Sequence, residues 1–295
     1  MPRDEDLVAQ LADLKVADSL PFRPSRSPSY RHLQLSPIPR FLVRVYSPNS
    51  DGSTDENWAK SRDAALERRP PVGDAFQRAD VQATAEEIAG HLWWSWEARH
   101  DNLVSWTSSV LYALQFIIYR HRSRKDGSPL EDIKLCIVDT QLLECGSFIR
   151  DMDLIEAFGA ESPALPGLFA LRTDGTHHFG EYLSQGALRI EGKCKIVSAQ
   201  AMLDSGLASI LPQLNFAADD QIQWASKVVE LRQQLSLAEI SPYIFSAEQA
   251  DIAFNISALF GSHWRLPFLV NLLACFAGRL EDTIIDEILT KGNFS

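Results

Sequence analysis

The stretch Asp101–Arg120, DNLVSWTSSVLYALQFIIYR, combines a strand pattern, a group of hydroxyl residues and a helix pattern. The apolar pair Leu103-Val104 leads into the hydroxyl residues, which are Ser105, Thr107, Ser108 and Ser109. Apolar residues then recur at helical spacing from 110 to 118, which predicts an amphipathic helix facing a core. Ser108 or Ser109 is expected to cap that helix, which leaves Ser105 and Thr107 without a local role. A strand end that opens onto a helix start is where α/β-type proteins place small-molecule sites.

An earlier strand is predicted at Phe41–Tyr46, FLVRVY, because the segment is β-branched and aromatic and is followed by Pro48. Alternation places Leu42, Arg44 and Tyr46 on one face. An arginine inside a strand either pairs with an anion or carboxylate, because burying it unpaired is costly, or faces solvent on an edge strand. The pattern does not decide between these two placements.

Strands and helices alternate irregularly through the middle of the chain. Further strands are predicted at Lys134–Asp139, Ser147–Arg150, Lys193–Ala199 and around Glu181, which alternates with Phe179 and Leu183. Short helices are predicted at Met152–Phe158, Ala201–Leu207 and near Trp58–Leu66. Thr84-Ala-Glu-Glu87 matches a capping box that opens a helix to about Trp94. Residues 160–176, interrupted by Pro and Gly, are interpreted as a loop.

Composition and the predicted strand and helix patterns divide the chain into three parts. Residues 1–40 contain a basic Ser/Pro stretch and are predicted to be an extended or disordered N-terminal tether. Residues 41–214 form the α+β part. Residues 215–295 show helix patterns only, ending with Asp282–Leu289, and are expected to be a helical appendage of small-domain size.

Composition restricts the classes of function. The chain has 295 residues and a formal net charge of −11, which disfavours nucleic acid as a partner. The N-terminus is too charged for a signal peptide and no apolar run is long enough to span a membrane. We therefore expect an intracellular protein, cytoplasmic or nuclear, with no membrane partner.

Other candidate sites have simpler interpretations. The spacing of the four cysteines suggests neither a metal site nor a disulfide framework, so no metal is expected, and His177-His178 are interpreted as surface histidines. Two acidic pairs, Asp139 with Glu144 and Asp151 with Asp153, are interpreted as solvated or capping groups. Trp93, Trp94 and Trp96 are interpreted as packing residues, with stacking on a planar ligand as the alternative.

Arg44 in the first strand, Ser105 and Thr107 at the strand–helix junction, and Glu181 after a loop stand in a distinctive order. They resemble the R–S–E arrangement of ADP-ribosyltransferases of the heat-labile enterotoxin and cholera toxin A-subunit type. FLVRVYSP supplies the arginine, NLVSWTSSVLYAL resembles the S-T-S block, and HFGEYLSQGALRI resembles the Glu-bearing block. The likeness covers residues 41–198, and the whole block also resembles a domain of unknown function found in many fungal proteins.

The resemblance implies an ADP-ribosyltransferase-like fold of split mixed or antiparallel sheets with flanking helices, using NAD as substrate. Arg44 would hold a phosphate or ribose of NAD and brace the fold. Ser105 would position Glu181 or the nicotinamide ribose, and Glu181 would stabilise an oxocarbenium-like transition state. Tyr46 or Trp106 would stack on a ring or pack in the core, and Thr107 completes the implied NAD-binding set.

Two residues depart from the family pattern and leave alternatives open. Trp106 replaces a small residue, and NAD would not fit if its side chain pointed into the cleft. Phe179 stands where arginine-targeting relatives carry a first glutamate, which leaves another protein acceptor, NAD hydrolysis or no activity. A non-catalytic interaction module that docks a partner on its helical tail is the alternative function. A third alternative, a structural or scaffolding protein with an unrelated α+β fold, would be supported if Arg44 and Glu181 lay far apart.

Overall fold

The computed structural model describes residues 18–67, 73–95, 100–214, 223–238 and 246–275. They form an α+β fold with a six-stranded and a three-stranded antiparallel sheet. The larger sheet has the order β6 (Ile149–Arg150), β7 (Glu181–Gln185), β4 (Leu103–Thr107), β1 (Phe41–Tyr46), β5 (Lys134–Asp139) and β9 (Cys194–Ser198). The smaller sheet has the order β2 (Ser53–Thr54), β3 (Trp58–Lys60) and β8 (Ala187–Arg189).

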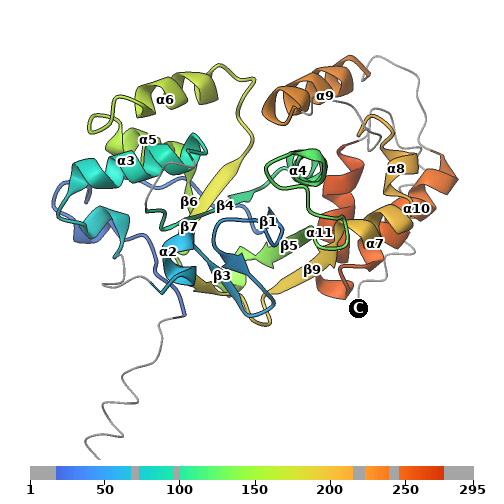
Figure 1. The fold of residues 1–295 in the computed structure, drawn as a ribbon, viewed down its shortest axis with the longest axis horizontal. Helices are drawn as coiled ribbons and strands as arrows, with labels where there is room; N and C mark the ends of the chain where they lie inside the picture. Colours follow the sequence, from blue (N-terminus) through green and yellow to red (C-terminus); the bar gives the residue numbers. More distant parts are fainter. Residues whose placement is uncertain (1–17, 68–72, 96–99, 215–222, 239–245, 276–295) are drawn as a thin grey trace, which may run out of the picture.

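Two groups of helices lie over the two ends of the larger sheet (Figure 1). The first group, which packs near β6, β7 and β4, is α3 (Val81–Leu92), α5 (Asp151–Phe158) and α6 (Leu165–Thr173). The second group is α4 (Val110–Arg122), α7 (Ala199–Asp204), α8 (Leu207–Ile210), α10 (Ala247–Ala258) and α11 (Ser262–Leu273). The polar helix α9 (Ala225–Ala238) lies beside α4.

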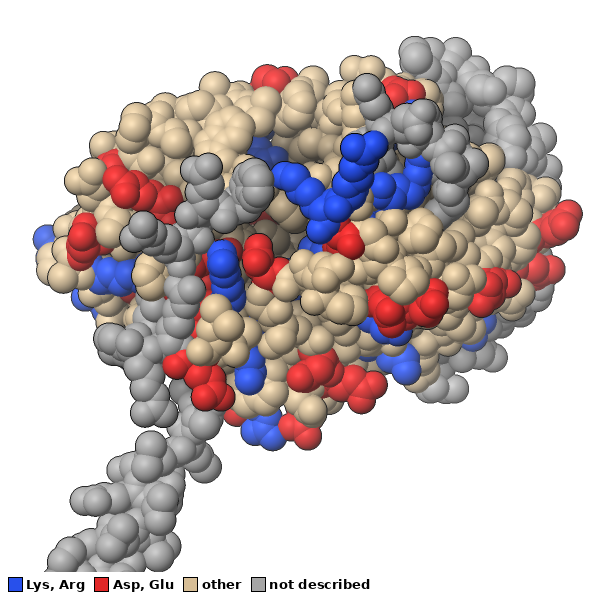
Figure 2. Space-filling view, in the orientation of Figure 1, with Lys and Arg blue, Asp and Glu red and all other residues tan. Residues whose placement is uncertain are grey.

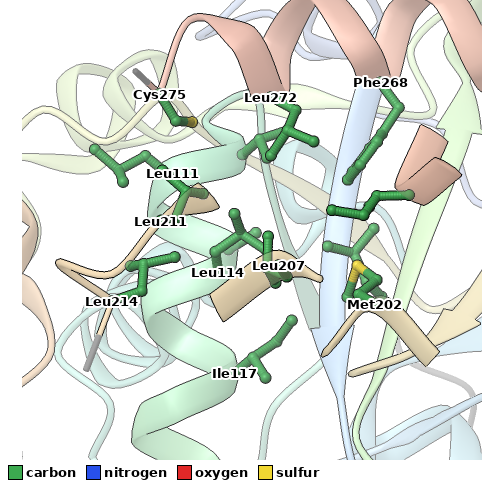
Figure 3. Close-up of a cluster of buried hydrophobic side chains, with 14 of the residues drawn as sticks. Leu111, Leu114, Ile117, Met202, Leu207, Leu211, Leu214, Phe268, Leu272 and Cys275 are labelled. Atoms are coloured by element: carbon green, nitrogen blue, oxygen red, sulfur yellow. The ribbon is translucent and has the colours of Figure 1, made fainter. Parts of the chain in front are cut away.

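Helix α4 is the hub of the second group. It follows β4 directly, and Ser109 caps its N-terminus by accepting from the backbone N–H of Tyr112. Its apolar face, which includes Leu111, Leu114 and Ile117, meets side chains of α7, α8, α11 and the adjoining segments (Figure 3). Helices α10 and α11 therefore share one hydrophobic cluster with β1, β5 and α4. This burial is non-directional and proportional to apolar area, so it holds the C-terminal helices to the sheet.

Strand pairing in the larger sheet is nearly interrupted between β1 and β4. The pairing of β1 with β5 runs along the whole strand, from Phe41 to Tyr46. Pairing with β4 is limited to the register Val43↔Thr107. Beyond this pair the backbone groups of the two strands need other partners, because unpaired buried polar groups are costly. Arg44 supplies one of them.

The two faces of the larger sheet have different environments. Trp106 and Tyr182 are cross-strand partners on the face toward the smaller sheet, where they pack with Leu188 and Ile190. Thr107 pairs with Glu181, and alternation places Ser105 and Glu181 together on the opposite, helix-covered face. The bulky Trp106 therefore points away from Ser105 and Glu181.

Several predicted elements differ in the structure. Residues 58–66 form β3 followed by the short helix α2 (Arg62–Ala65), instead of one helix. The capping box at Thr84 is wrong, because α3 starts earlier and is capped by the Asp80 side chain. Residues 160–176 contain α6, which was expected to be a loop; Pro166 lies in its first turn, where its missing N–H is tolerated.

The segment 18–40 lies against the domain and contains the short 3₁₀ helix η1 (Pro24–Arg26) and a turn after it. Phe22 is buried with Phe76 and Phe158, and its backbone N–H donates to the carbonyl of Gly146. The predicted helix at Asp282–Leu289 lies outside the described residues. Within the described part of the chain, no helix is both long and apolar enough to cross a bilayer.

Candidate functional site

Ser105 joins the two other residues of the predicted set. Its hydroxyl donates to Glu181 Oε1 at 3.0 Å, and its backbone carbonyl accepts from Arg44 Nη1 at 3.0 Å. Ser105 is half-buried, whereas the other two residues are buried. Arg44 and Glu181, predicted from separate parts of the sequence, thus each contact Ser105, Arg44 at its backbone carbonyl and Glu181 at its hydroxyl.

Arg44 contacts the backbone of Ser105 where the pairing of β1 with β4 is interrupted. Its Nε donates to Thr54 Oγ1 at 3.1 Å on β2, so its guanidinium ties β1 to β4 and to the smaller sheet. Burial and the nearby positive charge of Arg120 lower the pKa of Arg44 to about 10, so the side chain stays charged at neutral pH. Of the two placements the sequence allowed, the structure gives the buried one, with neutral oxygens as the hydrogen-bonding acceptors.

His91, which the sequence interpretation missed, completes a hydrogen-bonded chain on the other side of Ser105. Its Nδ1 lies 2.8 Å from Asp101 Oδ2 and its Nε2 lies 2.8 Å from Ser105 Oγ. Burial lowers the pKa of His91, but the negative charges of Asp101 and Glu181 outweigh burial and raise it. No motif marked His91, because it lies on α3, ten residues before its Asp101 partner.

The proton positions follow from these partners. The Ser105 hydroxyl has a single hydrogen, which it donates to Glu181 Oε1. Nε2 of His91 must then donate to Ser105 Oγ, and Nδ1 must donate to Asp101. The raised pKa of His91 favours this arrangement, in which both ring nitrogens carry a proton. In a nucleophilic triad the histidine accepts the serine proton, so this arrangement orients the Ser105 hydroxyl toward Glu181 and does not activate it for attack.

Glu181 has a second partner, Arg172 on α6. Arg172 Nη2 lies 2.7 Å from Glu181 Oε2, and both side chains are nearly inaccessible. Arg172 Nη1 donates to the carbonyl of His177 at 3.0 Å. The sequence interpretation missed Arg172 because residues 160–176 were expected to be a loop. An unbroken apolar run at Leu168-Phe-Ala-Leu171 was the available signal for a helix there.

Asp151 is a second carboxylate beside Arg172. Its Oδ2 lies 3.3 Å from Arg172 Nε, and neither atom has a hydrogen-bond partner among the described residues. Its side chain is 1% exposed. Burial, and then the negative charge of Glu181, raise the pKa of Asp151 to about 7. Asp151 is therefore not solvated, although its Oδ1 accepts from the backbone N–H of Met152 at the start of α5.

Replacing Asp151 with asparagine is expected to change how stability depends on pH. The folded pKa is raised, so between about pH 4 and 7 the folded chain holds a proton that the unfolded chain has lost. Asp151 therefore contributes a loss of stability as pH rises through that window. We expect the free energy of unfolding of Asp151→Asn, relative to wild type, to increase from pH 5 to pH 8 in urea titrations. A difference between the two proteins that is constant over this range would contradict the placement of Asp151.

The segment 177–180 brings Glu181 to the end of β7. Gly180 has a φ of +62°, and a Cβ there would lie 2.2 Å from Ser108 Oγ. The carbonyl of Gly180 accepts from the backbone N–H of Ser108 at 2.9 Å, and that of Phe179 accepts from Thr107 Oγ1 at 2.8 Å. Ser108 and Thr107 therefore fix the backbone of the two residues that precede Glu181. This gives the hydroxyl cluster a role beyond helix capping.

Two residues of the implied NAD-binding set lie elsewhere. Trp106 is 1% exposed, and its indole N–H donates to Ser184 Oγ at 3.0 Å. Tyr46 packs with the same cluster between the sheets. Thr107 is buried with its hydroxyl bonded to Phe179. Both aromatic rings thus pack in the core, on the face away from Glu181.

The face of the molecule drawn in Figure 2 is hollowed in the region between α6 and α9. Basic side chains gather along this hollow, and acidic side chains lie beside it (Figures 1 and 2). Trp94, which is 43% exposed, packs edge-on against Trp224 and Phe116. Trp93 is 48% exposed and donates to the carbonyl of Ala164, while Trp96 lies outside the described residues. These tryptophans pack as predicted, although only on one side.

The site residues fall within one recognised family segment. A comparison with curated proteins and a comparison with solved structures each find no match. The model of a family described as "Domain of unknown function (DUF7587)" matches residues 37–191, just over half of the chain. This segment includes Arg44, His91, Ser105, Arg172 and Glu181. The chain therefore belongs to the DUF7587 family.

Proposed function

We propose that this chain is an ADP-ribosyltransferase-like protein that binds NAD and transfers or hydrolyses its ADP-ribosyl group. The observation that carries the proposal is the contact of Arg44 and Glu181 with the same residue, Ser105. Residues that resemble the R–S–E set meet at one point although 137 positions separate the first from the last.

The sheet topology also supports an ADP-ribosyltransferase-like fold. The resemblance implies split sheets, and the larger sheet here parts between β1 and β4, where pairing is limited to Val43 and Thr107. The opening lies at the arginine and serine that the resemblance marks. Arg44 therefore braces the two strands, one of the two roles proposed for it.

In the proposed chemistry one side chain acts on the nicotinamide ribose and two others hold it in place. Glu181 bonds the ribose 2′-hydroxyl and stabilises the positive charge that develops as nicotinamide leaves. Ser105 fixes the carboxylate by donating to Oε1, and the His91 imidazolium fixes Ser105. Each carboxylate oxygen has two lone pairs, so Glu181 can accept from the ribose while it keeps the Ser105 bond.

The identity of the nucleophile separates transfer from hydrolysis. Either a protein acceptor or water attacks the ribose carbon that nicotinamide leaves. Phe179 stands two residues before Glu181, and its ring stacks on Tyr112 at 5.0 Å, so this position offers no carboxylate to an arginine acceptor. Acceptors of other chemistry and water remain in the proposal.

A non-catalytic interaction module is the second candidate, and one observation favours it. Arg172 pairs with Glu181 at 2.7 Å, and Glu181 is only 4% exposed. A carboxylate neutralised by a guanidinium stabilises a developing cation less well. On this alternative the cluster is structural, and the C-terminal helices supply the surface for a partner.

Titration of NAD into the purified chain, followed by separation of the products, tests the proposal. We expect heat of binding and then nicotinamide, together with free ADP-ribose for hydrolysis or ADP-ribose attached to protein for transfer. The interaction module predicts that NAD is recovered unchanged. If NAD gives no heat and no nicotinamide is released, the proposed function is wrong.

A further inference from the structure

Two acidic side chains and one guanidinium meet at the start of β7. The last pair in the register of β6 with β7 is Arg150↔Tyr182. Asp151 follows Arg150 as the first residue of α5, and Glu181 precedes Tyr182, so the two acidic residues come side by side. Like charges at opposite positions of neighbouring strands destabilise the pairing. The sheet register therefore creates a need for a cation between Asp151 and Glu181.

Arg172 on α6 supplies this cation and contacts both acidic groups with different nitrogens. Its Nη2 lies 2.7 Å from Glu181 Oε2, and its Nε lies 3.3 Å from Asp151 Oδ2. Its Nη1 donates to the carbonyl of His177 at 3.0 Å, which anchors the guanidinium. One positive charge thus faces two acidic side chains, and the shorter contact is with Glu181.

The contact between Arg172 and Asp151 is incomplete. Neither Arg172 Nε nor Asp151 Oδ2 has a hydrogen-bond partner among the described residues, although both atoms are buried. A buried polar atom without a partner is costly. Asp151 Oδ1 accepts from the backbone N–H of Met152 at 2.8 Å, so the carboxyl group is held in place with Oδ2 near Arg172. A shift of the guanidinium toward Asp151 would give both atoms a partner, and it would release Glu181 Oε2.

We propose that Asp151 is a positioning residue that takes Arg172 over from Glu181, so that Glu181 faces the developing ribose cation with its full negative charge. This inference rests on the proposed function and names how the carboxylate of that site is released from its counter-ion. Arg172 keeps its bond to the His177 carbonyl and exchanges Glu181 Oε2 for Asp151 Oδ2. A proton held by Asp151 leaves to water in this exchange, because only the ionised carboxylate attracts the guanidinium.

The exchange makes the site depend on pH. Burial, and then the negative charge of Glu181, raise the pKa of Asp151 to about 7, and the positive charge of Arg172 acts against them. The charged and titratable groups that act on Asp151 come from four surrounding elements, and they are Arg172 on α6, Glu181 and Tyr182 on β7, Arg150 on β6 and Tyr112 on α4. Nicotinamide release should increase as pH rises through about 7, because Asp151 then ionises and competes for Arg172.

Asp151→Asn tests the exchange in the full chain, because asparagine has no charge with which to attract Arg172. We expect kcat for nicotinamide release at pH 8 to fall by about tenfold, within the range of coupling between members of one ion-pair network. The affinity for NAD should stay unchanged, and the increase with pH should disappear. The matched control Asp153→Asn lies two residues later on α5, where both carboxylate oxygens accept from Ser36, and should keep the wild-type kcat and pH profile. An Asp151→Asn protein with the wild-type kcat and pH profile would overturn the inference.

Carbon NMR titration of the Asp151 carboxyl group, in the absence of NAD, separates this inference from the proposed function. The Asp151 signal is assigned by its loss in Asp151→Asn. In Glu181→Gln, Arg172 is free to pair with Asp151, so we expect a lower pKa of Asp151 than in Glu181→Gln combined with Arg172→Met. Both variants lack the Glu181 charge, so the comparison reports the guanidinium alone, and thermal melts confirm that each variant is folded.

The two measurements have distinguishable outcomes. Equal pKa values of Asp151 in the two Glu181 variants would show that Arg172 does not move to Asp151, and the inference would be wrong even if the wild type cleaves NAD. A lower pKa in Glu181→Gln, together with a wild-type chain that releases no nicotinamide, would support the exchange of Arg172 and contradict the proposed function.

Discussion

Replacing Glu181 with glutamine is expected to lower the rate of nicotinamide release from NAD by ~10²–10³-fold, the usual effect of removing one preorganised electrostatic group. Glutamine has the same shape and keeps an oxygen that can accept from Ser105 or Arg172. It lacks the negative charge that, in the proposed reaction, stabilises the developing ribose cation. The effect should therefore appear at saturating NAD, as a loss in kcat, because the group acts mainly in the transition state.

A matched substitution shows whether this loss is specific. Glu191→Gln removes one negative charge from an exposed ion pair with Arg189, outside the strands that form the site. Its rate of nicotinamide release should equal that of wild type. If Glu181→Gln keeps more than half of the wild-type rate while its melting temperature is unchanged, Glu181 is not the catalytic carboxylate.

Replacing Arg172 with methionine is expected to destabilise the fold by about 3–5 kcal/mol, the range for breaking a buried pair from one side. Arg172 lies between Glu181 and Asp151, whose side chains are 5% and 1% exposed. Its removal leaves two buried carboxylates without their counter-ion. Urea denaturation at pH 8 measures the loss. The loss should shrink toward pH 5, where Asp151 is protonated in the folded chain.

Two further variants check the cause. Arg172→Met combined with Asp151→Asn removes one positive and one negative charge, so it should be more stable than Arg172→Met alone. Arg189→Met breaks an exposed pair and should change stability little, since surface pairs contribute little. An Arg172→Met protein with the wild-type urea midpoint would show that the Arg172 pairs are not stabilising.

Much of the fold could be predicted where one periodicity dominates. Phe41–Tyr46 and Lys134–Asp139 are strands with the predicted bounds, and the helix after Ser109 begins where a hydroxyl cap was expected. These segments have long apolar patterns that are bounded by residues that start or end an element. Predictions failed where polar residues competed, as at Thr84, because Asp80 is an equally good cap four residues earlier.

The candidate site could be predicted only in part, for a physical reason. Arg44, Ser105 and Glu181 stand out because they interrupt apolar strands, where a polar side chain needs an explanation. His91, Arg172 and Asp151 stand on helices and at a strand end, where charged residues are ordinary. Their importance arises from tertiary packing, which brings α3, α5 and α6 over the centre of the sheet. One sequence contains no local signal of that packing.

The register of β4 decides on which face of the sheet the Trp106 side chain lies. In the sequence Trp106 stands between Ser105 and Thr107, and NAD would not fit if its side chain pointed into the cleft. Pairing of β4 with β7 places it opposite Tyr182, on the face toward the smaller sheet. A shift of one residue in that register would exchange the two faces. The side of the sheet that holds Ser105 and Glu181 is therefore clear of this ring.

The release of nicotinamide from NAD by the purified wild-type chain is the measurement that tests the central claim most directly. Chromatography of a time course, with a buffer blank beside it, measures the rate without assuming any acceptor. The Arg44–Ser105–Glu181 site predicts nicotinamide above the blank, formed in proportion to protein concentration. Nicotinamide at the level of the blank, at NAD concentrations that saturate binding, would contradict the claim that this site cleaves NAD.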